Sequence, residues 1–266
     1  MKTVIIIPAR YGSTRFPGKP LALIGGKSML SRVVDVAREV SSKFGDIGIY
    51  VATDDERIAE HAAHIGVECI ITDSSCRTGS DRALEAAKKL PEKPDFILNL
   101  QGDAPFTPPQ AIYAILEHLQ NNPDAQVVTP ACQLSWVDLT RLRTSKVATP
   151  FSGTCVVYGK DGKAFWFSKN IIPAIRNEPQ LRQTMDGSPV YQHLGLYGYR
   201  YDILEKFCSL PEGYYEKMEG LEQLRMLENG ISIHCVEIKI EDGEYHSGID
   251  TPEDLKRAEA IIDGWA

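Results

Sequence analysis

Three cationic side chains lie in a short glycine- and proline-containing loop near the N-terminus. Arg10, Arg15 and Lys19 fall within PARYGSTRFPGKP, directly after a β-branched apolar run. Fixed cations and backbone N–H groups can converge on the oxygens of a polyanion, so this loop predicts a phosphate-binding site. It is not a Walker A loop, because proline follows Lys19 where that motif has serine or threonine. A solvated basic loop is the alternative interpretation.

Two aspartates could hold a divalent cation against such a phosphate. Asp103 ends the string NLQGD, beside a glycine that lets a ligand come close. Asp250 lies in GIDTPEDL, where Asp250 or Thr251 could simply cap a helix that Pro252 begins. Magnesium binds few protein carboxylates, and phosphate oxygens and water complete its octahedron. The two aspartates therefore predict a magnesium site if they meet.

Alternating strands and helices must position these residues. Apolar runs predict strands at 2–8, 47–53, 68–72 and 95–100. Helical periodicity predicts helices at 28–40, 55–65, 81–90 and 108–120. This rhythm is typical of a mostly parallel, Rossmann-like α/β sheet with helices on both faces. Ligands bind such sheets at the carboxyl ends of the strands, where the basic loop and NLQGD both follow a strand.

The pattern changes in the second half of the sequence. Further strands are predicted at 127–133, 154–158, 164–168, 195–200 and 231–238, and helices at 202–207, 221–228 and 252–262. Lys160-Asp161-Gly162-Lys163 predicts a hairpin turn. No internal repeat or low-complexity linker divides the sequence. We therefore expect a single domain over residues 1–266 that contains a smaller mixed β subregion at about 127–225.

The composition excludes several classes of protein. With 266 residues, of which 43% are hydrophobic, the chain can bury a sizeable core. A net charge of −7 argues against a general nucleic-acid binder, which needs a basic surface. The six cysteines form no CxxC pair, so neither a zinc site nor a disulfide framework is indicated. No apolar stretch has the length of a signal-peptide core or a membrane span, so we expect a cytoplasmic protein without membrane insertion.

Six strings together resemble the cytidylyltransferases that activate 3-deoxy-manno-octulosonate, the Kdo of bacterial lipopolysaccharide. In order, they are IIIPARYGSTRFPGKPL, YVATDDERI, NLQGD, HLGLYGYR, LEQLR and GIDTPEDL. The sialic-acid cytidylyltransferases resemble the chain mainly in the first string. The resemblance to the Kdo family implies a fold of the nucleotide-diphospho-sugar transferase type and a homodimer formed through the mixed β subregion. It also implies CTP as donor, magnesium as cofactor, and CMP-Kdo and pyrophosphate as products.

The resemblance further implies roles for individual residues. The nucleotide would be bound by Pro8, Ala9, Arg10, Arg15, Lys19, Thr53, Asp54, Ser80 and Arg82. The sugar would be bound by Gln101, Lys169, His193, Tyr197, Glu222 and Gln223. The catalytic residues would be Lys19, Asp103 and Asp250, and both aspartates would bind magnesium. Simpler interpretations stay open: His193 could be a core histidine, and Glu222 could form a surface pair with Arg225.

The sequence departs from the family pattern at four places. Ala104 replaces the glutamate after QGD, Cys155 the lysine of VKVV and Lys169 the arginine of FSR, while residues 78–82 read TGSDR for SGTER. Extra segments lie near 136–150 and 176–189. Lysine lacks the planar fork of arginine, and losing the glutamate removes a negative acceptor. These changes predict a Kdo-like acid altered at its far end, such as 8-amino-Kdo.

Three other functions compete with this one. CMP transfer to another nonulosonic acid of the sialic type would use the same donor loop and metal. A catalytically weak homologue that only binds CTP or a CMP-sugar would fit the departures, but it would have little need of Asp103 and Asp250. A dinucleotide-binding oxidoreductase is disfavoured because no GxGxxG follows the first strand.

Overall fold

The computed structural model describes residues 2–12, 16–45, 47–240, 249, 254–256 and 258–260. The chain forms two compact units. Unit 1 comprises Met1–Tyr113, Leu196–Cys208 and Glu241–Ala266. Unit 2 comprises Ala114–Gly195 and Ser209–Ile240. Unit 2 holds most of the range predicted for the mixed β subregion, whereas residues 196–208 of that range belong to unit 1.

The sheet of unit 1 is mostly parallel, as predicted. Its described strands are β1 (Thr3–Pro8), β4 (Gly48–Thr53), β5 (Glu68–Ile71), β6 (Phe96–Asn99) and β11 (Tyr197–Arg200). Their order is β5-β4-β1-β6-β11, with only β11 antiparallel to its neighbour β6. The chain moves outward from β1 to β4 and β5 and then returns to place β6 on the other side of β1. The strand order therefore reverses between β1 and β6, which is where open α/β sheets bind ligands.

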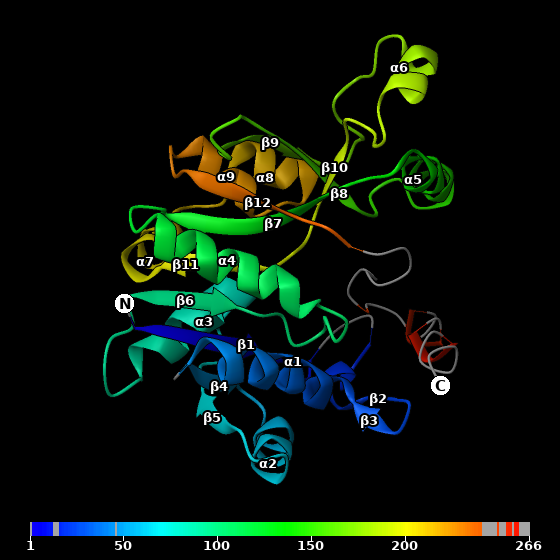
Figure 1. Cartoon of the computed structure of the whole chain (residues 1–266). Coiled ribbons are helices and arrows are strands. Elements are labelled where there is room, and N and C mark those ends of the chain that lie inside the picture. The colour runs from blue at the N-terminus through cyan, green and yellow to red at the C-terminus, as the bar shows by residue number, and fades with distance from the viewer. Residues whose placement is uncertain are drawn as a thin grey trace. The chain divides into compact units, whose positions relative to one another are not determined.

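Helices cover both faces of this sheet (Figure 1). They include α1 (Met29–Phe44), α2 (Glu56–His64) and α3 (Gly79–Lys88). The positions of α1 predicted to be apolar are buried, and Ser28 caps its first turn by accepting a hydrogen bond from the Ser31 N–H. Thr78 and Asp81 form a capping box at the start of α3. The α/β architecture predicted from the strand and helix periodicities is thus confirmed.

Shorter elements complete unit 1. They are η1 (Lys19–Leu21), β2 (Leu23–Ile24), β3 (Lys27–Ser28) and α7 (Tyr201–Ser209). The helix predicted at 252–262 is described at 254–256 and 258–260, which are helical. Ile249 and Ala258 pack in a buried cluster with Ile24 and Met29. Ile249 and Ala258 therefore lie beside β2 and the start of α1.

The sheet of unit 2 is mixed. Its described strands are β7 (Val127–Gln133), β8 (Thr154–Tyr158), β9 (Ala164–Ser168), β10 (Tyr191–His193) and β12 (Ile233–Ile238). Strand β10 lies antiparallel between β7 and β8, β9 is antiparallel to β8, and β12 is parallel to β7. The turn between β8 and β9 is the predicted one: Gly162 has a φ of 80°, a conformation that favours glycine.

Several elements of unit 2 were not predicted. They are α5 (Trp136–Ala148), α6 (Glu178–Thr184), α8 (Tyr214–Glu219) and β10, and they accompany α4 (Pro109–Asn121) and α9 (Gln223–Glu228). Helix α5 has a weak apolar stripe, and Val137 and Val147 on it are exposed. The sequence does mark the start of this helix, because Ser135 is a typical N-cap residue and accepts a hydrogen bond from the Asp138 N–H. The periodicity of the segment was too polar to predict a helix.

All six cysteines are free thiols. Within the described ranges, no helix combines the length and the apolar character that crossing a membrane requires.

Candidate functional site

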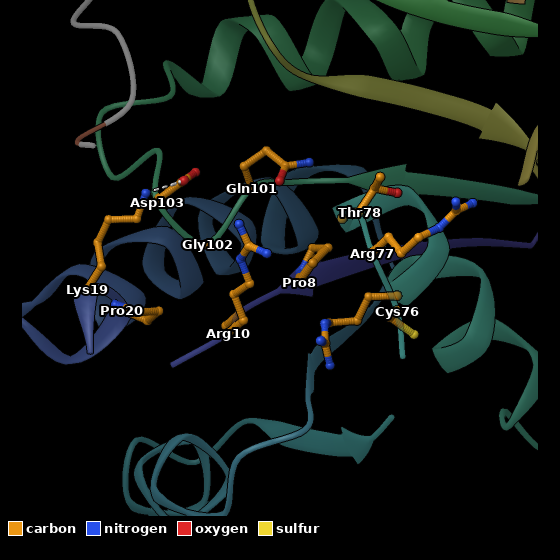
Figure 2. A pocket seen from close by; sticks show the side chains of 13 residues that line it. Pro8, Arg10, Lys19, Pro20, Cys76, Arg77, Thr78, Gln101, Gly102 and Asp103 are labelled. Atoms are coloured by element: carbon orange, nitrogen blue, oxygen red, sulfur yellow. Dashed lines mark hydrogen bonds and ion pairs between the residues drawn. The ribbon is translucent and has the colours of Figure 1, made fainter. Parts of the chain in front are cut away.

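A cavity of about 310 Å³ opens in unit 1 beside the carboxyl ends of β1 and β6. It is lined by Pro8, Ala9, Arg10, Lys19, Pro20, Cys76, Arg77, Thr78, Gly79, Arg82, Gln101, Gly102 and Asp103 (Figure 2). The cavity therefore lies where the strand order reverses. It brings together the following residues that the sequence analysis assigned to the site: Pro8, Ala9, Arg10, Lys19, Arg82, Gln101 and Asp103.

Glycine at position 102 lets two backbone segments meet at the floor of the cavity. A Cβ atom there would lie 2.7 Å from the carbonyl oxygen of Pro8, closer than such atoms approach. The Gly102 N–H instead donates to that oxygen at 3.2 Å. The turn of NLQGD is thus attached directly to the end of β1, which brings Gln101 and Asp103 to the basic loop.

Lys19 and Asp103 form an ion pair inside the cavity. Lys19 Nζ lies 2.6 Å from Asp103 Oδ2, and the Lys19 side chain is 9% exposed while that of Asp103 is 37% exposed. Gly18 precedes this lysine with a φ of 71° and starts the short helix η1 that carries it. The pair therefore combines a largely buried cation with a carboxylate that remains accessible to a ligand.

Two arginines add positive charge to the cavity in different ways. Arg10 is exposed, and its side chain extends toward Gln101 and Gly102 (Figure 2). Arg82 is 3% exposed. Its Nη1 lies 3.2 Å from Asp54 Oδ1 and donates to Thr72 Oγ1 at 2.5 Å. Arg10 is thus free to adapt to a ligand, whereas Arg82 is held in place before one arrives.

Three residues predicted to be near the nucleotide support the cavity without lining it. Thr53 is fully buried, and its carbonyl oxygen accepts a hydrogen bond from the Thr72 N–H at 2.8 Å. Asp54 pairs with the guanidinium of the cavity residue Arg82. Ser80 is 1% exposed within the first turn of α3. These residues therefore shape the wall behind the cavity.

The loop after β5 contributes cavity residues that the sequence analysis did not assign. Cys76, Arg77, Thr78 and Gly79 all line the cavity. A Cβ atom on Gly79 would lie 2.9 Å from Gln101 Oε1, so the start of α3 closely approaches NLQGD. The order of the strands indicates these residues: because β5 is parallel to β4, the loop that follows β5 opens at the same edge of the sheet as the loop that follows β4. The residue types alone did not suggest it.

Cys76 is held as a thiol. Its Sγ donates to Glu85 Oε2 at 2.9 Å. Burial, reinforced by the hydrogen bond and charge of Glu85, raises the pKa of the Cys76 thiol to about 12. It is therefore protonated at neutral pH and is not a nucleophile in this cavity.

Two residues of the predicted site, Arg15 and Asp250, lie outside the described residues. The residue before Asp250 is described. The Ile249 N–H donates to the carbonyl oxygen of Asp103 at 3.1 Å. The backbone of Ile249 therefore contacts the backbone of Asp103.

His193, on β10 of unit 2, is a buried and neutral histidine. Its Nε2 lies 2.8 Å from Thr129 Oγ1, and its ring packs edge-on against Phe167 at 5.0 Å between centroids. Burial, with a smaller contribution from the positive charge of Lys169, lowers the pKa of His193 to about 3. These contacts are the ones expected if His193 is a core histidine.

Lys169 directly follows β9 in unit 2. Its N–H donates to Glu219 Oε2 at 2.8 Å, and its Nζ donates to Thr154 Oγ1 at 3.3 Å. The preceding Ser168 hydroxyl donates to Glu219 Oε1 at 2.8 Å. Glu219 thus holds the end of β9 with both carboxylate oxygens.

The remaining residues assigned to the sugar lie in two places. Glu222 is the N-terminal cap residue of α9 and Gln223, 3% exposed, begins that helix. Arg225 is not a surface residue, because it donates to both oxygens of the buried Glu216 at 2.6 and 2.8 Å. Tyr197 belongs to unit 1, where it is 5% exposed and pairs with Asn99 across β11 and β6.

The departures from the family pattern have different structural settings. The Ala104 N–H closes the NLQGD turn by donating to the Gln101 carbonyl oxygen at 3.1 Å. Cys155 is fully buried in an apolar cluster with Leu134, Trp136 and Leu139. It therefore contributes to the apolar core of unit 2, so this departure is explained by packing.

The donor set of the cavity fits a hard cation that keeps most of its ligands as water and phosphate. Across the part of the chain that the structure describes, no group of three or more His, Cys, Asp or Glu side chains could hold a metal. Asp103 offers an accessible carboxylate among cations that suit phosphate. Magnesium commonly binds with one or two carboxylates and substrate oxygens, so this set is compatible with it.

Comparisons with known proteins agree with this geometry. The family model described as cytidylyltransferase matches residues 4–237. A 3-deoxy-manno-octulosonate cytidylyltransferase from Maricaulis maris is 46% identical, covering 98% of this chain and 97% of the relative. Another from Desulfatibacillum aliphaticivorans is 40% identical, covering 98% and 99%. The structure of CMP:2-keto-3-deoxy-manno-octonic acid synthetase complexed with CTP covers 100% of both chains, with a TM-score of 0.85 and 33% identity. The chain belongs to the 3-deoxy-manno-octulosonate cytidylyltransferase family.

Proposed function

We propose that this protein transfers CMP from CTP to the anomeric hydroxyl of 3-deoxy-manno-octulosonate and releases pyrophosphate. The observation that carries this proposal is the cavity at the strand-order reversal. It holds Arg10, Lys19 and Arg82 around the accessible carboxylate of Asp103. Such a charge distribution suits a nucleoside triphosphate, and the family relatives that match the whole chain are named for this activity.

The reaction requires positioning and charge stabilisation above all. The sugar hydroxyl attacks the α-phosphorus, a P–O bond forms, and the bond to the departing pyrophosphate breaks. Negative charge develops on the phosphate oxygens. Lys19 and Arg10 would bind these oxygens directly. Arg82, already fixed by Asp54 and Thr72, would supply a cation that needs no rearrangement.

We propose magnesium as the cofactor, held by Asp103 and Asp250. The accessible Asp103 carboxylate and the hydrogen bond from Ile249 to the Asp103 backbone support this assignment. When bound, magnesium would polarise the α-phosphate and lower the pKa of the attacking hydroxyl. Lys19 would share the Asp103 carboxylate with the metal or turn to the triphosphate when both substrates are present.

For the sugar acid, we propose Lys169 of unit 2 as the cation that recognises its carboxylate. The lysine replaces a planar arginine fork with a single point charge, which relaxes the geometry of recognition. The loss of the family's glutamate at Ala104 motivates the finer proposal that an 8-amino analogue of Kdo is the preferred acid. Competition between the two acids at equal concentration tests it, and faster turnover of ordinary Kdo would overturn it.

We also propose a homodimer formed through unit 2. Large apolar side chains of β9 and α8 are exposed, namely Phe165 at 67%, Tyr214 at 66% and Met218 at 63%. Trp166 of β9 and Tyr215 of α8 join them by an edge-on contact at 5.0 Å. An apolar surface of this kind typically marks an interface. Light scattering should give a molar mass of two chains for the wild type and of one chain for Met218→Glu.

The central experiment measures pyrophosphate release with magnesium, each of CTP, UTP, ATP and GTP, and a panel of Kdo, 8-amino-Kdo and sialic acid. We expect turnover only with CTP and a Kdo-like acid. Asp103→Asn should remove it, whereas Lys160→Ala in the exposed β8–β9 turn should not. Turnover with sialic acid alone, or CTP binding without turnover of any acid, would overturn the proposal.

A further inference from the structure

The ammonium group of Lys146, in the last turn of α5, lies in a cage of backbone carbonyl oxygens. It donates to Lys169 at 2.7 Å, Gly153 at 3.2 Å and Pro150 at 3.4 Å, and also to the carbonyl oxygen of Ser152. Burial lowers the pKa of Lys146. A partly buried ammonium that finds its partners in main-chain carbonyls fixes the course of the backbone around it.

Helix α5 presents this lysine from the same face that packs into unit 2. Leu139, Leu142 and Lys146 are spaced three and four residues apart, so they share one side of the helix. Leu139 and Leu142 pack in the apolar cluster that contains Cys155, Ile171 and Ile172. Helix α5 thus packs against both β8 and the segment that follows Lys169.

Both main-chain polar groups of Lys169 therefore have charged partners. Glu219 accepts from its N–H at 2.8 Å, and Lys146 donates to its carbonyl oxygen at 2.7 Å. The two partners come from α8 and α5, which lie on opposite sides of residue 169 in the sequence. With its backbone held at both ends of the residue, the Lys169 side chain reaches Thr154 Oγ1 at 3.3 Å.

We infer that Lys146 is a positioning residue for substrate recognition: by holding the Lys169 backbone, it directs the Lys169 ammonium to the carboxylate of the sugar acid. The inference rests on the proposed function, in which Lys169 binds that carboxylate. Lysine has about as much rotamer freedom as arginine but lacks its pre-organised planar fork, so its point charge recognises an anion best when the backbone that carries it is fixed. Helix α5 supplies that constraint.

The direct test is Lys146→Met, which keeps most of the side-chain volume and removes the ammonium. We expect the KM for the sugar acid to rise about tenfold, the effect of losing one charge-assisted hydrogen bond. The KM for CTP should change less than twofold, because the nucleotide cavity lies in unit 1. The matched control is Arg141→Met, on the exposed side of the same helix, which should leave both constants unchanged.

Chemical rescue separates positioning from simple loss of structure. Lys146→Ala lacks the atoms of n-propylammonium, so adding this cation should restore the KM for the sugar acid toward the wild-type value. Tetramethylammonium, which has no N–H group, should not. An equal rise in both KM values, without rescue, would show that Lys146 acts only through stability and would overturn the inference.

A readout without catalysis completes the test. The Lys169 N–H donates to Glu219, and its hydrogen exchange should accelerate in Lys146→Met while amides of β6 stay protected. If the wild type is active but Lys146→Met shows neither faster exchange nor a raised KM for the sugar acid, the inference is overturned while the proposed function stands. A wild-type protein that transfers CMP to none of the acids overturns the proposed function, and the sugar role of Lys169 with it.

Discussion

The nucleotide cavity of unit 1 and the Lys169 region of unit 2 are built in different ways. In the cavity, residues that act together come from turns that directly follow strands, as with Gly102 and Pro8 at their 3.2 Å hydrogen bond. Around Lys169, the groups that hold one residue come from α5, β8 and α8. A site encoded in short strings can be found by reading the sequence, whereas one assembled from distant segments depends on the packing of an entire unit. Substitutions should therefore affect the two regions differently.

The largest effect is expected from the buried ion pair of unit 2. Arg225→Met leaves Glu216 buried without its bidentate partner, which should lower the free energy of unfolding by about 4 kcal/mol. Denaturant titration measures this loss. A change below about 1 kcal/mol would mean that unit 2 does not depend on this buried ion pair between α8 and α9, and it would weaken the contrast with unit 1.

The next effect tests the cavity. Lys19→Met should reduce kcat/KM for CMP transfer by roughly a hundredfold or more, equivalent to about 3 kcal/mol of transition-state stabilisation. Its effect on stability should be small, because the carboxylate that it leaves unpaired, Asp103, is 37% exposed and stays solvated. The matched control, Lys2→Met, removes an exposed lysine of unit 1 and should retain full activity. Loss of stability as large as in Arg225→Met would contradict the comparison.

A third prediction concerns pH. The pKa of His193 is about 3 in the folded protein and near 6.5 in the unfolded chain, so below pH 6.5 only the unfolded chain takes up the proton. Stability therefore falls as the pH drops. Between pH 7 and 5 the wild type should lose about 2 kcal/mol more than His193→Gln. Thermal unfolding of both proteins at the two pH values measures the difference, and equal slopes would show that His193 is not buried in its neutral form.

The smallest effect is expected on the exposed side of α5. Arg141 pairs with Asp138 at 2.9 Å, but the arginine side chain is 69% exposed. Arg141→Met should change the free energy of unfolding by less than about 1 kcal/mol, because water screens such pairs. Denaturant titration alongside Arg225→Met provides the measurement. A larger loss would indicate that α5 depends on its surface charges and would disqualify this variant as a control for Lys146.

The sequence predicted the framework of unit 1 because its signals are local. Buried parallel strands appear as short β-branched runs. The glycine of NLQGD was interpreted as room for a ligand, whereas the structure shows that Gly102 closely approaches the Pro8 backbone. Cys76 and Arg77 escaped notice because nothing in their residue types indicates a cavity; the strand order places them there. The helix α5 was missed because its apolar positions are few, although Ser135 and Asp138 marked its start. Lys146 could not have been found, since its acceptors are main-chain carbonyls that belong to any residue type.

The path of the chain has a consequence for synthesis on the ribosome. The chain leaves unit 1 after residue 113 and returns to it for residues 196–208. It leaves again after residue 208 and returns at residue 241. Strand β11, which pairs with β6, therefore emerges only after strands β7 to β10 have been made. The first 113 residues must wait for almost ninety more before that edge of their sheet is covered. During this interval the edge of β6 is open to a wrong strand, and a nascent-chain chaperone would have its clearest opportunity to act.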